Sequence, residues 1–103
     1  MTMLDLAAIS NLPLTAGLFL DYHADANASN SKGYNALHHA SKNGHTQVVK
    51  TIINHQNSAE TADINKKTKS GKTPIMLAVA NKHYRTLLAL LPNNDSEQKE
   101  TPA

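Results

Sequence analysis

Apolar positions along the chain fall into three pairs of short segments separated by polar loops, and this pattern predicts pairs of helices. The first segment of each pair carries small apolar residues and the second carries bulkier ones. The first segments hold Leu4, Leu6, Ala7 and Ala8, then Leu37 and Ala40, then Ile75, Leu77 and Ala78. The second segments hold Leu18, Phe19 and Leu20, then Val48, Val49, Ile52 and Ile53, then Leu87, Leu90 and Leu91. One helix pair cannot bury its apolar faces alone, so we expect an all-α fold in which three pairs stack.

The chain repeats itself in a constant register. The segment "GYNALHHASKNGHTQVVKTIIN", from residue 33, aligns with "GKTPIMLAVANKHYRTLLALLP", from residue 71, at an offset of 38 residues. A third copy lies 33 residues upstream, where Leu4 and Ala7 fall on Leu37 and Ala40. The longer offset contains an insertion of five residues, 58–62, before Asp63. The sequence therefore predicts three repeats.

This pattern resembles the ankyrin repeat, a 33-residue unit of two antiparallel helices and a β-hairpin. The segments "GKTPIMLAVA", "NGHTQVVKTII" and "HADANA" carry the family's motifs, and the resemblance covers about residues 2–92. It implies an all-α solenoid of three stacked repeats with short β-hairpin loops. We expect a repeat domain at residues 1–92, with repeats at about 1–29, 30–67 and 68–92, and a polar, disordered tail at 93–103.

The starts of the first helices can be read from the residues themselves. Gly33 and Gly71 precede them where a tight turn needs a positive φ. Thr2, Asn35 and Thr73 are then the N-caps. Pro74 suits the first helical position, where its missing N–H is not needed.

The string "SGKT" at residues 70–73 also resembles the end of a phosphate-binding P-loop. That loop needs a glycine five residues before Gly71, and Lys66 stands there. A polar segment, "DINKKTK", replaces the buried strand that should precede the loop. The string therefore marks a helix start and not a nucleotide site.

Several residues depart from the family pattern. Asn11 and Lys82 replace the glycine between the two helices, and His23 and Gln56 replace the glycine after the second helix. Each replacement after the second helix costs on the order of 1 kcal/mol, whereas the asparagine at position 11 tolerates the glycine geometry best. Ala36 replaces the proline, and Asp5 and Met76 replace the histidine of the repeat. We therefore expect a protein of marginal stability.

Composition narrows the function classes. The formal net charge is only +2, the aromatic content is 4%, and there is no cysteine. The absence of cysteine fits a reducing compartment, and no apolar run reaches transmembrane length. The apolar N-terminal segment lacks the basic region of a signal peptide and contains Asp5. We expect a cytoplasmic location, which would be the host cytosol for a secreted effector.

Candidate chemistry is sparse. A zinc cluster of histidines is the sharpest alternative, but the resemblance gives His38, His45 and His83 structural roles in the repeat. It gives Asp25 and Asp63 the family's structural aspartate position. No nucleophile motif or carboxylate pair is visible. We expect no enzymatic activity, no cofactor and no metal.

The resemblance implies a binding surface made of hairpin tips and the exposed face of the first helices. The corresponding candidates are Ser31, Lys32, Tyr34, Lys42, Asn43, Lys69, Ser70, Lys72 and Asn81. Tyr34 stands out because tyrosine is frequent at binding hot spots and no feature of the repeat requires it there. The alternative is that Tyr34 only packs beside the neighbouring hairpin.

We therefore expect a non-enzymatic protein–protein interaction module. One alternative is a fragment, or a regulatory or substrate-recruiting part, of a larger ankyrin protein such as a bacterial or viral host-directed effector. A lesser alternative is nucleic-acid binding through Lys66, Lys67, Lys69 and Lys72, although no aromatic residue interleaves with these lysines. We expect no membrane partner, and an exposed Leu88 offers a site for self-association.

Overall fold

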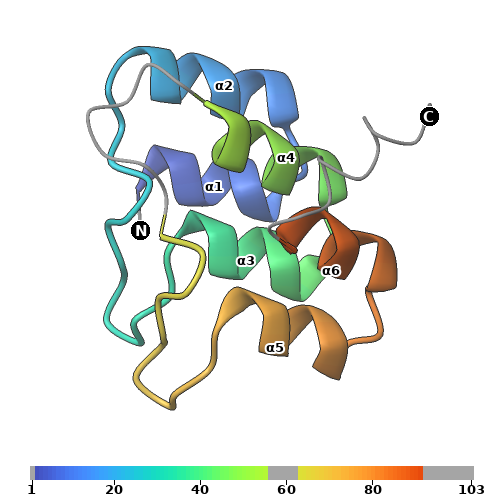
Figure 1. Ribbon diagram of the computed structural model, residues 1–103. Helices are drawn as coiled ribbons and strands as arrows, with labels where there is room; N and C mark the ends of the chain where they lie inside the picture. The colour runs from blue at the N-terminus through green and yellow to red at the C-terminus, as the bar shows by residue number, and fades with distance from the viewer. Residues whose placement is uncertain (1, 56–62, 92–103) are drawn as a thin grey trace, which may run out of the picture.

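Six short helices form a stack of three antiparallel pairs in the computed structural model, which describes residues 2–55 and 63–91 (Figure 1). The helices are α1 (Met3–Ile9), α2 (Pro13–Asp21), α3 (Ala36–Asn43), α4 (Thr46–Asn54), α5 (Pro74–Ala80) and α6 (Tyr84–Leu90). Helices α1, α3 and α5 form one row, and α2, α4 and α6 form the other. The predicted all-α solenoid is confirmed.

The predicted helix starts are also confirmed. The side chains of Thr2, Asn35 and Thr73 accept hydrogen bonds from backbone N–H groups three residues further on, at 3.0, 3.0 and 3.2 Å. Pro74 is the first residue of α5. Each first helix therefore begins with a locally satisfied cap, which the sequence specifies without help from the rest of the fold.

Six residues adopt the left-handed backbone conformation within the described ranges. Three are glycines, Gly33, Gly44 and Gly71, with φ between 73° and 82°. The other three are Asn11, His23 and Lys82, with φ of 58°, 69° and 62°. These are three of the four positions at which the sequence replaces a family glycine, and the fourth, Gln56, lies outside the described residues.

The core lies between the two rows of helices and runs the length of the stack. Leu4, Leu20, Leu37, Val48 and Leu90 are all at least 98% buried, and small residues such as Ala8 and Ala40 are fully buried. The small residues let α1, α3 and α5 approach one another, as expected. Bulkier residues of α2, α4 and α6 fill the remaining space.

The loops before α3 and α5 project from one edge of the stack and lie side by side (Figure 1). Each is closed by backbone hydrogen bonds, from Asn30 N to Tyr34 O and from Thr68 N to Lys72 O, both 2.9 Å. No strand is assigned within residues 2–55 and 63–91, so the predicted β-hairpins are hydrogen-bonded turns there. A bond of 3.1 Å from Lys69 N to Lys32 O joins the two tips.

Histidines link successive repeats. The Nε2–H group of His38 donates to the carbonyl oxygen of Lys66 at 2.8 Å, and Nδ1–H of His45 donates to that of Ala8 at 2.8 Å. His38 also accepts from the N–H of Asn35 at 3.0 Å through Nδ1. The structural roles predicted for these two histidines are confirmed.

The aspartates that precede the hairpins have local structural roles. A carboxylate oxygen of Asp25 accepts from Asn27 N, and one of Asp63 accepts from Asn65 N, both at 2.9 Å. These short-range bonds fix the chain direction after the second helices, as the repeat pattern implies.

Candidate functional site

Two adjoining depressions lie along the loop edge of repeats 2 and 3, and together we call them the tip groove. One, of about 260 Å³, is lined by Asn30, Ser31, Lys32, Tyr34, His39 and Lys42. The other, of about 390 Å³, is lined by Ser31, Lys32, Tyr34, Lys69 and Ser70. The bond between Lys69 N and Lys32 O fixes the two tips relative to each other. The groove is therefore preformed by backbone contacts.

Tyr34 forms the centre of the tip groove and is half-buried. Its ring stacks on the ring of His39, with 5.4 Å between centroids and 29° between planes, and meets the edge of His38 at 5.6 Å. Tyr34 thus packs on α3 of its own repeat and not only beside the neighbouring hairpin, and its use in binding stays a prediction. A tyrosine held in place by such packing loses little conformational freedom when a partner binds.

Lysines border the groove. Lys32, Lys42 and Lys69 are exposed on its rim, and Lys42 Nζ lies 5.7 Å from the centroid of the Tyr34 ring. The sequence has no acidic residue between 26 and 59 and none between 64 and 94. No carboxylate from these segments is available to neutralise the rim, so the groove favours an anionic ligand group.

His39 is a groove residue that the sequence analysis missed. Burial lowers the pKa of His39, while the carboxylate of Asp5 opposes that shift and Lys42 adds to it. The neutral ring is a flat base for Tyr34, and its Nε2 atom has no hydrogen-bond partner among the described residues. No sequence signal marked His39, because its role depends on the ring of Tyr34 five residues earlier.

Asn30 was missed as well, although its role is local. Its side-chain oxygen accepts from Lys32 N at 2.9 Å and from Tyr34 N at 3.0 Å, which shapes the loop that carries Tyr34. An asparagine at the start of a tight turn is the signal that would have identified it.

Three predicted site residues do not belong to the groove. Asn43, Lys72 and Asn81 are exposed but line neither depression. The side-chain amides of Asn43 and Asn81 donate to the carbonyl oxygens of His39 and Leu77, both at 2.9 Å, and so cap the ends of α3 and α5. The structure therefore brings together Ser31, Lys32, Tyr34, Lys42, Lys69 and Ser70.

Within residues 2–55 and 63–91, no group of three or more His, Cys, Asp or Glu side chains is placed to hold a metal ion. In the same part of the chain, no helix is long and apolar enough to cross a membrane.

Stacked helix pairs with projecting loops along one edge define a helical repeat solenoid. A family model described as ankyrin repeats, in three copies, matches residues 4–101, so the chain belongs to the ankyrin-repeat family. The match extends past residue 92, the expected end of the domain, into residues outside the described part.

The chain is similar to Rabankyrin-5 from Mus musculus, with 29% identity over 90 residues. The aligned region is 87% of this chain but only 7% of the length of that curated relative. Ankyrin repeats are generally protein–protein interaction modules, and the family is typically non-enzymatic.

Proposed function

We propose that this chain is a non-enzymatic interaction module that binds an acidic segment of a partner protein in the tip groove. The observation that carries the proposal is the position of Tyr34, held by His39 and surrounded by Lys32, Lys42 and Lys69. A fixed aromatic ring provides apolar contact area at low entropic cost. The lysines add attraction for carboxylates and raise the association rate.

The size and shape of the groove favour an extended segment over a compact small molecule. The two depressions share Ser31, Lys32 and Tyr34 and so continue from one into the other across the joined tips. Small-molecule sites are usually deeper and more apolar than a lysine-rimmed groove along a loop edge. An acidic loop or terminus of a protein matches both the charge and the length of this surface.

The test is capture of partners from a cell lysate on the immobilised chain, followed by mass spectrometry. We compare the wild type with Lys32→Glu/Lys69→Glu, which reverses charge inside the groove. The matched control is Lys50→Glu/Lys72→Glu, which makes the same charge change at exposed lysines outside it. A partner lost only with the groove variant, and then bound directly in purified form, supports the proposal. Equal loss with both variants, or with neither, contradicts it.

Nucleic-acid binding is the second candidate, since residues 64–91 contain six basic residues and no acidic one. Fluorescence anisotropy with a labelled single-stranded oligonucleotide tests it at two salt concentrations. Phosphate-backbone binding would fall steeply between about 50 and 200 mM salt. In that case Lys72→Glu would weaken oligonucleotide binding as much as Lys69→Glu. Binding of an acidic peptide in the groove would be weakened by Lys69→Glu and not by Lys72→Glu.

We also propose a cytoplasmic location, supported by the absence of cysteine in the chain. If the chain is a regulatory or substrate-recruiting part of a larger ankyrin protein, such as a bacterial or viral host-directed effector, the same groove would bind the recruited protein. Fractionation of cells that express the tagged chain tests the location directly.

A further inference from the structure

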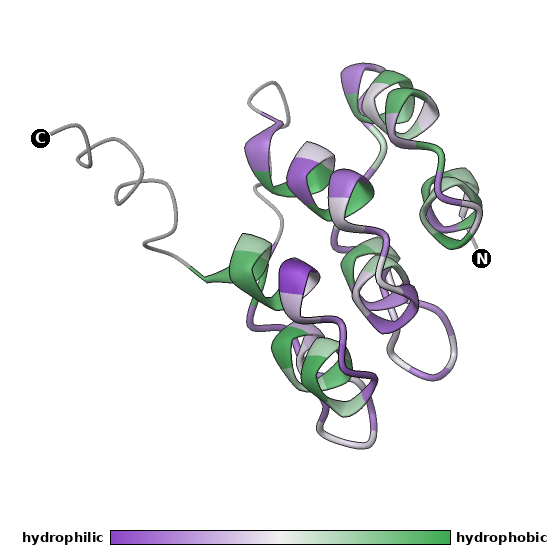
Figure 2. Cartoon of the chain, turned by 90° about the vertical axis from the view of Figure 1, so that its right-hand side faces the viewer, coloured by the Kyte–Doolittle hydropathy of each residue, from purple (hydrophilic) through white to green (hydrophobic). Residues whose placement is uncertain are grey.

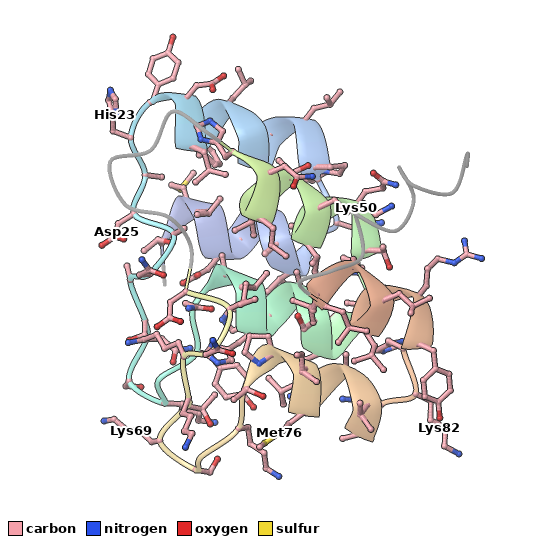
Figure 3. All side chains as sticks on the ribbon, in the orientation of Figure 1. His23, Asp25, Lys50, Lys69, Met76 and Lys82 are labelled. Carbon is pink, nitrogen blue, oxygen red and sulfur yellow. The ribbon has the colours of Figure 1, made fainter. Side chains whose placement is uncertain are left out.

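The outer face of repeat 3 exposes apolar residues, two of them at positions that are buried in both preceding repeats. Met76 and Val79 of α5 are 47% and 45% exposed, whereas their equivalents His38 and Ser41 are fully buried beneath repeat 3. Met76 points away from α3 at this end of the stack (Figure 3). Leu88 of α6 is 55% exposed. Hydrophobic residues, green in Figure 2, lie on the outer side of α5 as well as on its side toward α3. We call this surface the C-terminal face.

The outer face of repeat 1 is apolar too. Leu14, Leu18 and Tyr22 recur every four residues along α2 and its C-cap, and they are 85%, 56% and 82% exposed. Met3 and Leu6 of α1, at 60% and 47%, extend the same surface. We call it the N-terminal face.

Contacts inside the stack show that the N-terminal face is the side on which another repeat packs. In repeat 2, Thr51 and His55 are the equivalents of Leu18 and Tyr22, 33 residues later. A Cβ atom at Gly17 of repeat 1 would lie 3.5 Å from Thr51, and His55 bonds to Asp21 at 2.8 Å. Repeat 1 therefore packs on the surface of repeat 2 that includes Thr51 and His55. The equivalent surface of repeat 1, which includes Leu18 and Tyr22, is exposed.

We propose that the C-terminal face of one copy of this chain binds the N-terminal face of a second copy, so that the solenoid continues from chain to chain. The two faces are the two halves of the repeat–repeat interface that α1 makes with α3, and α2 with α4. Capping repeats of a solenoid normally carry a polar outer face, which keeps the stack soluble. Here both outer faces carry large apolar side chains, and apolar patches rimmed by polar residues mark interaction sites.

Charge favours this head-to-tail arrangement over a symmetric one. Residues 1–29 carry three acidic side chains, of which Asp21 and Asp25 are exposed, and no lysine or arginine. Residues 64–91 carry six basic side chains and no acidic one. Asp25 lies toward the first end of the stack and Lys82 toward the other (Figure 3). Joining unlike ends brings opposite charges together, and joining like ends brings equal charges together.

The repeat register specifies which residues meet. Within the stack, Gly17 faces Thr51 of the next repeat. Leu88 lies 71 positions after Gly17 and takes its place, and Leu18 of the next copy takes the place of Thr51. The two leucines therefore face each other across the proposed contact. Within the stack, the carbonyl of Ala8 accepts from His45. Val79 takes the place of Ala8 and Leu12 of the next copy takes the place of His45, so Val79 and Leu12 are expected to meet. Two leucines fill more volume than Gly17 and Thr51, so the joined second helices must lie further apart than α2 and α4.

Sedimentation velocity over a range of chain concentrations tests the proposal, with circular dichroism to verify folding. Leu88→Asp blocks the C-terminal face and Leu18→Asp blocks the N-terminal face, and both side chains are more than half exposed. Val79→Asp and Tyr22→Asp are second variants for the same faces, because Tyr22 takes the position of His55, which repeat 1 contacts. The control is Gln47→Glu, which adds one negative charge at an exposed position of the middle repeat.

We expect the wild type and Gln47→Glu to associate with rising concentration, and each face variant alone to raise the dissociation constant at least about tenfold. A mixture of Leu88→Asp and Leu18→Asp should form dimers with the wild-type affinity, because each variant retains one intact face that the other can bind. A wild type that stays monomeric at all concentrations overturns the proposal. So does association that survives both variants, or a mixture that fails to restore binding.

Discussion

The imidazole of His38 joins α3 to the loop that leads to α5, since its Nε2–H donates to the carbonyl oxygen of Lys66 at 2.8 Å while its Nδ1 accepts from the N–H of Asn35 at 3.0 Å. One ring thus caps α3 and holds the start of that loop. Both bonds require the neutral ring with its proton on Nε2, because a proton on Nδ1 would remove the acceptor for Asn35.

The first prediction concerns pH. Burial lowers the pKa of His38 and of His39. Below about pH 6.5, the ordinary value for histidine, the unfolded chain binds protons at these sites that the folded chain resists. The free energy of unfolding should therefore be highest above about pH 6.5 and fall as the pH decreases. Thermal unfolding followed by circular dichroism between pH 7.5 and 5 measures this slope.

The double variant His38→Gln/His39→Gln is the companion to that measurement. Glutamine at the third position of a helix can still complete a capping box, but it does not titrate. We expect the variant to have a smaller dependence of the unfolding temperature on pH below 6.5. An unchanged slope would assign the acid sensitivity to other groups.

The second prediction compares Gly33 with Gly71, which have φ of 81° and 82°. A Cβ at Gly33 would lie 2.8 Å from the backbone nitrogen of Lys69, whereas nothing lies within 4 Å of one at Gly71. Gly71→Ala should cost about 1 kcal/mol of unfolding free energy, the cost of the left-handed conformation. Gly33→Ala should cost about 1–3 kcal/mol more, because the backbone of the neighbouring tip must move.

Urea denaturation of the two alanine variants measures both costs. Gly33→Ala should also weaken binding in the tip groove, because Lys32 and Lys69 move with the two tips. Equal destabilisation by the two substitutions would show that the contact between the tips is too loose to matter.

The third prediction concerns Gly44, which ends α3 with φ of 73°. A Cβ there would lie 2.6 Å from Nδ1 of His83 and 2.8 Å from two of its ring carbons. Gly44→Ala should therefore be more destabilising in the wild type than in a His83→Ala background. A double-mutant cycle should give a coupling free energy of about 1 kcal/mol or more. Additive costs would mean that the His83 ring simply moves aside.

The fourth prediction is that glycine stabilises the chain at two left-handed positions. His23 and Lys82 have φ of 69° and 62°, where a Cβ is unfavourable. His23→Gly and Lys82→Gly should each raise the free energy of unfolding by about 0.5–1 kcal/mol, after the entropic cost of glycine in the unfolded chain. Asn11→Gly is the comparison, with a smaller gain expected because asparagine tolerates this conformation. Urea midpoints that fall with glycine at His23 and Lys82 would reveal side-chain contacts that outweigh the strain.

Much of this architecture is encoded locally, and for that reason the sequence determined it. The N-caps at Thr2, Asn35 and Thr73, the proline start of α5 and the left-handed turns depend on a few neighbouring residues each. Because the apolar residues recur along both helices of every pair, the pairs must stack to bury their apolar faces. Exposure of Leu88 also followed from the register, since Leu88 takes the position of Lys50, which is exposed as well.

Tertiary structure decided what depends on the distance between segments far apart in the chain. The sequence treats Gly33 and Gly71 alike, and only the approach of Lys69 to Gly33 distinguishes them. The sequence left open whether Tyr34 is a binding residue or only packs beside the neighbouring hairpin, and the turn of the loop placed its ring on His39. Lys69 and Lys72 are lysines of the same loop and look alike in the sequence, yet only Lys69 borders the groove. Local rules set where each helix begins and ends, whereas a binding surface depends on which side chains of neighbouring repeats come together once the stack has formed.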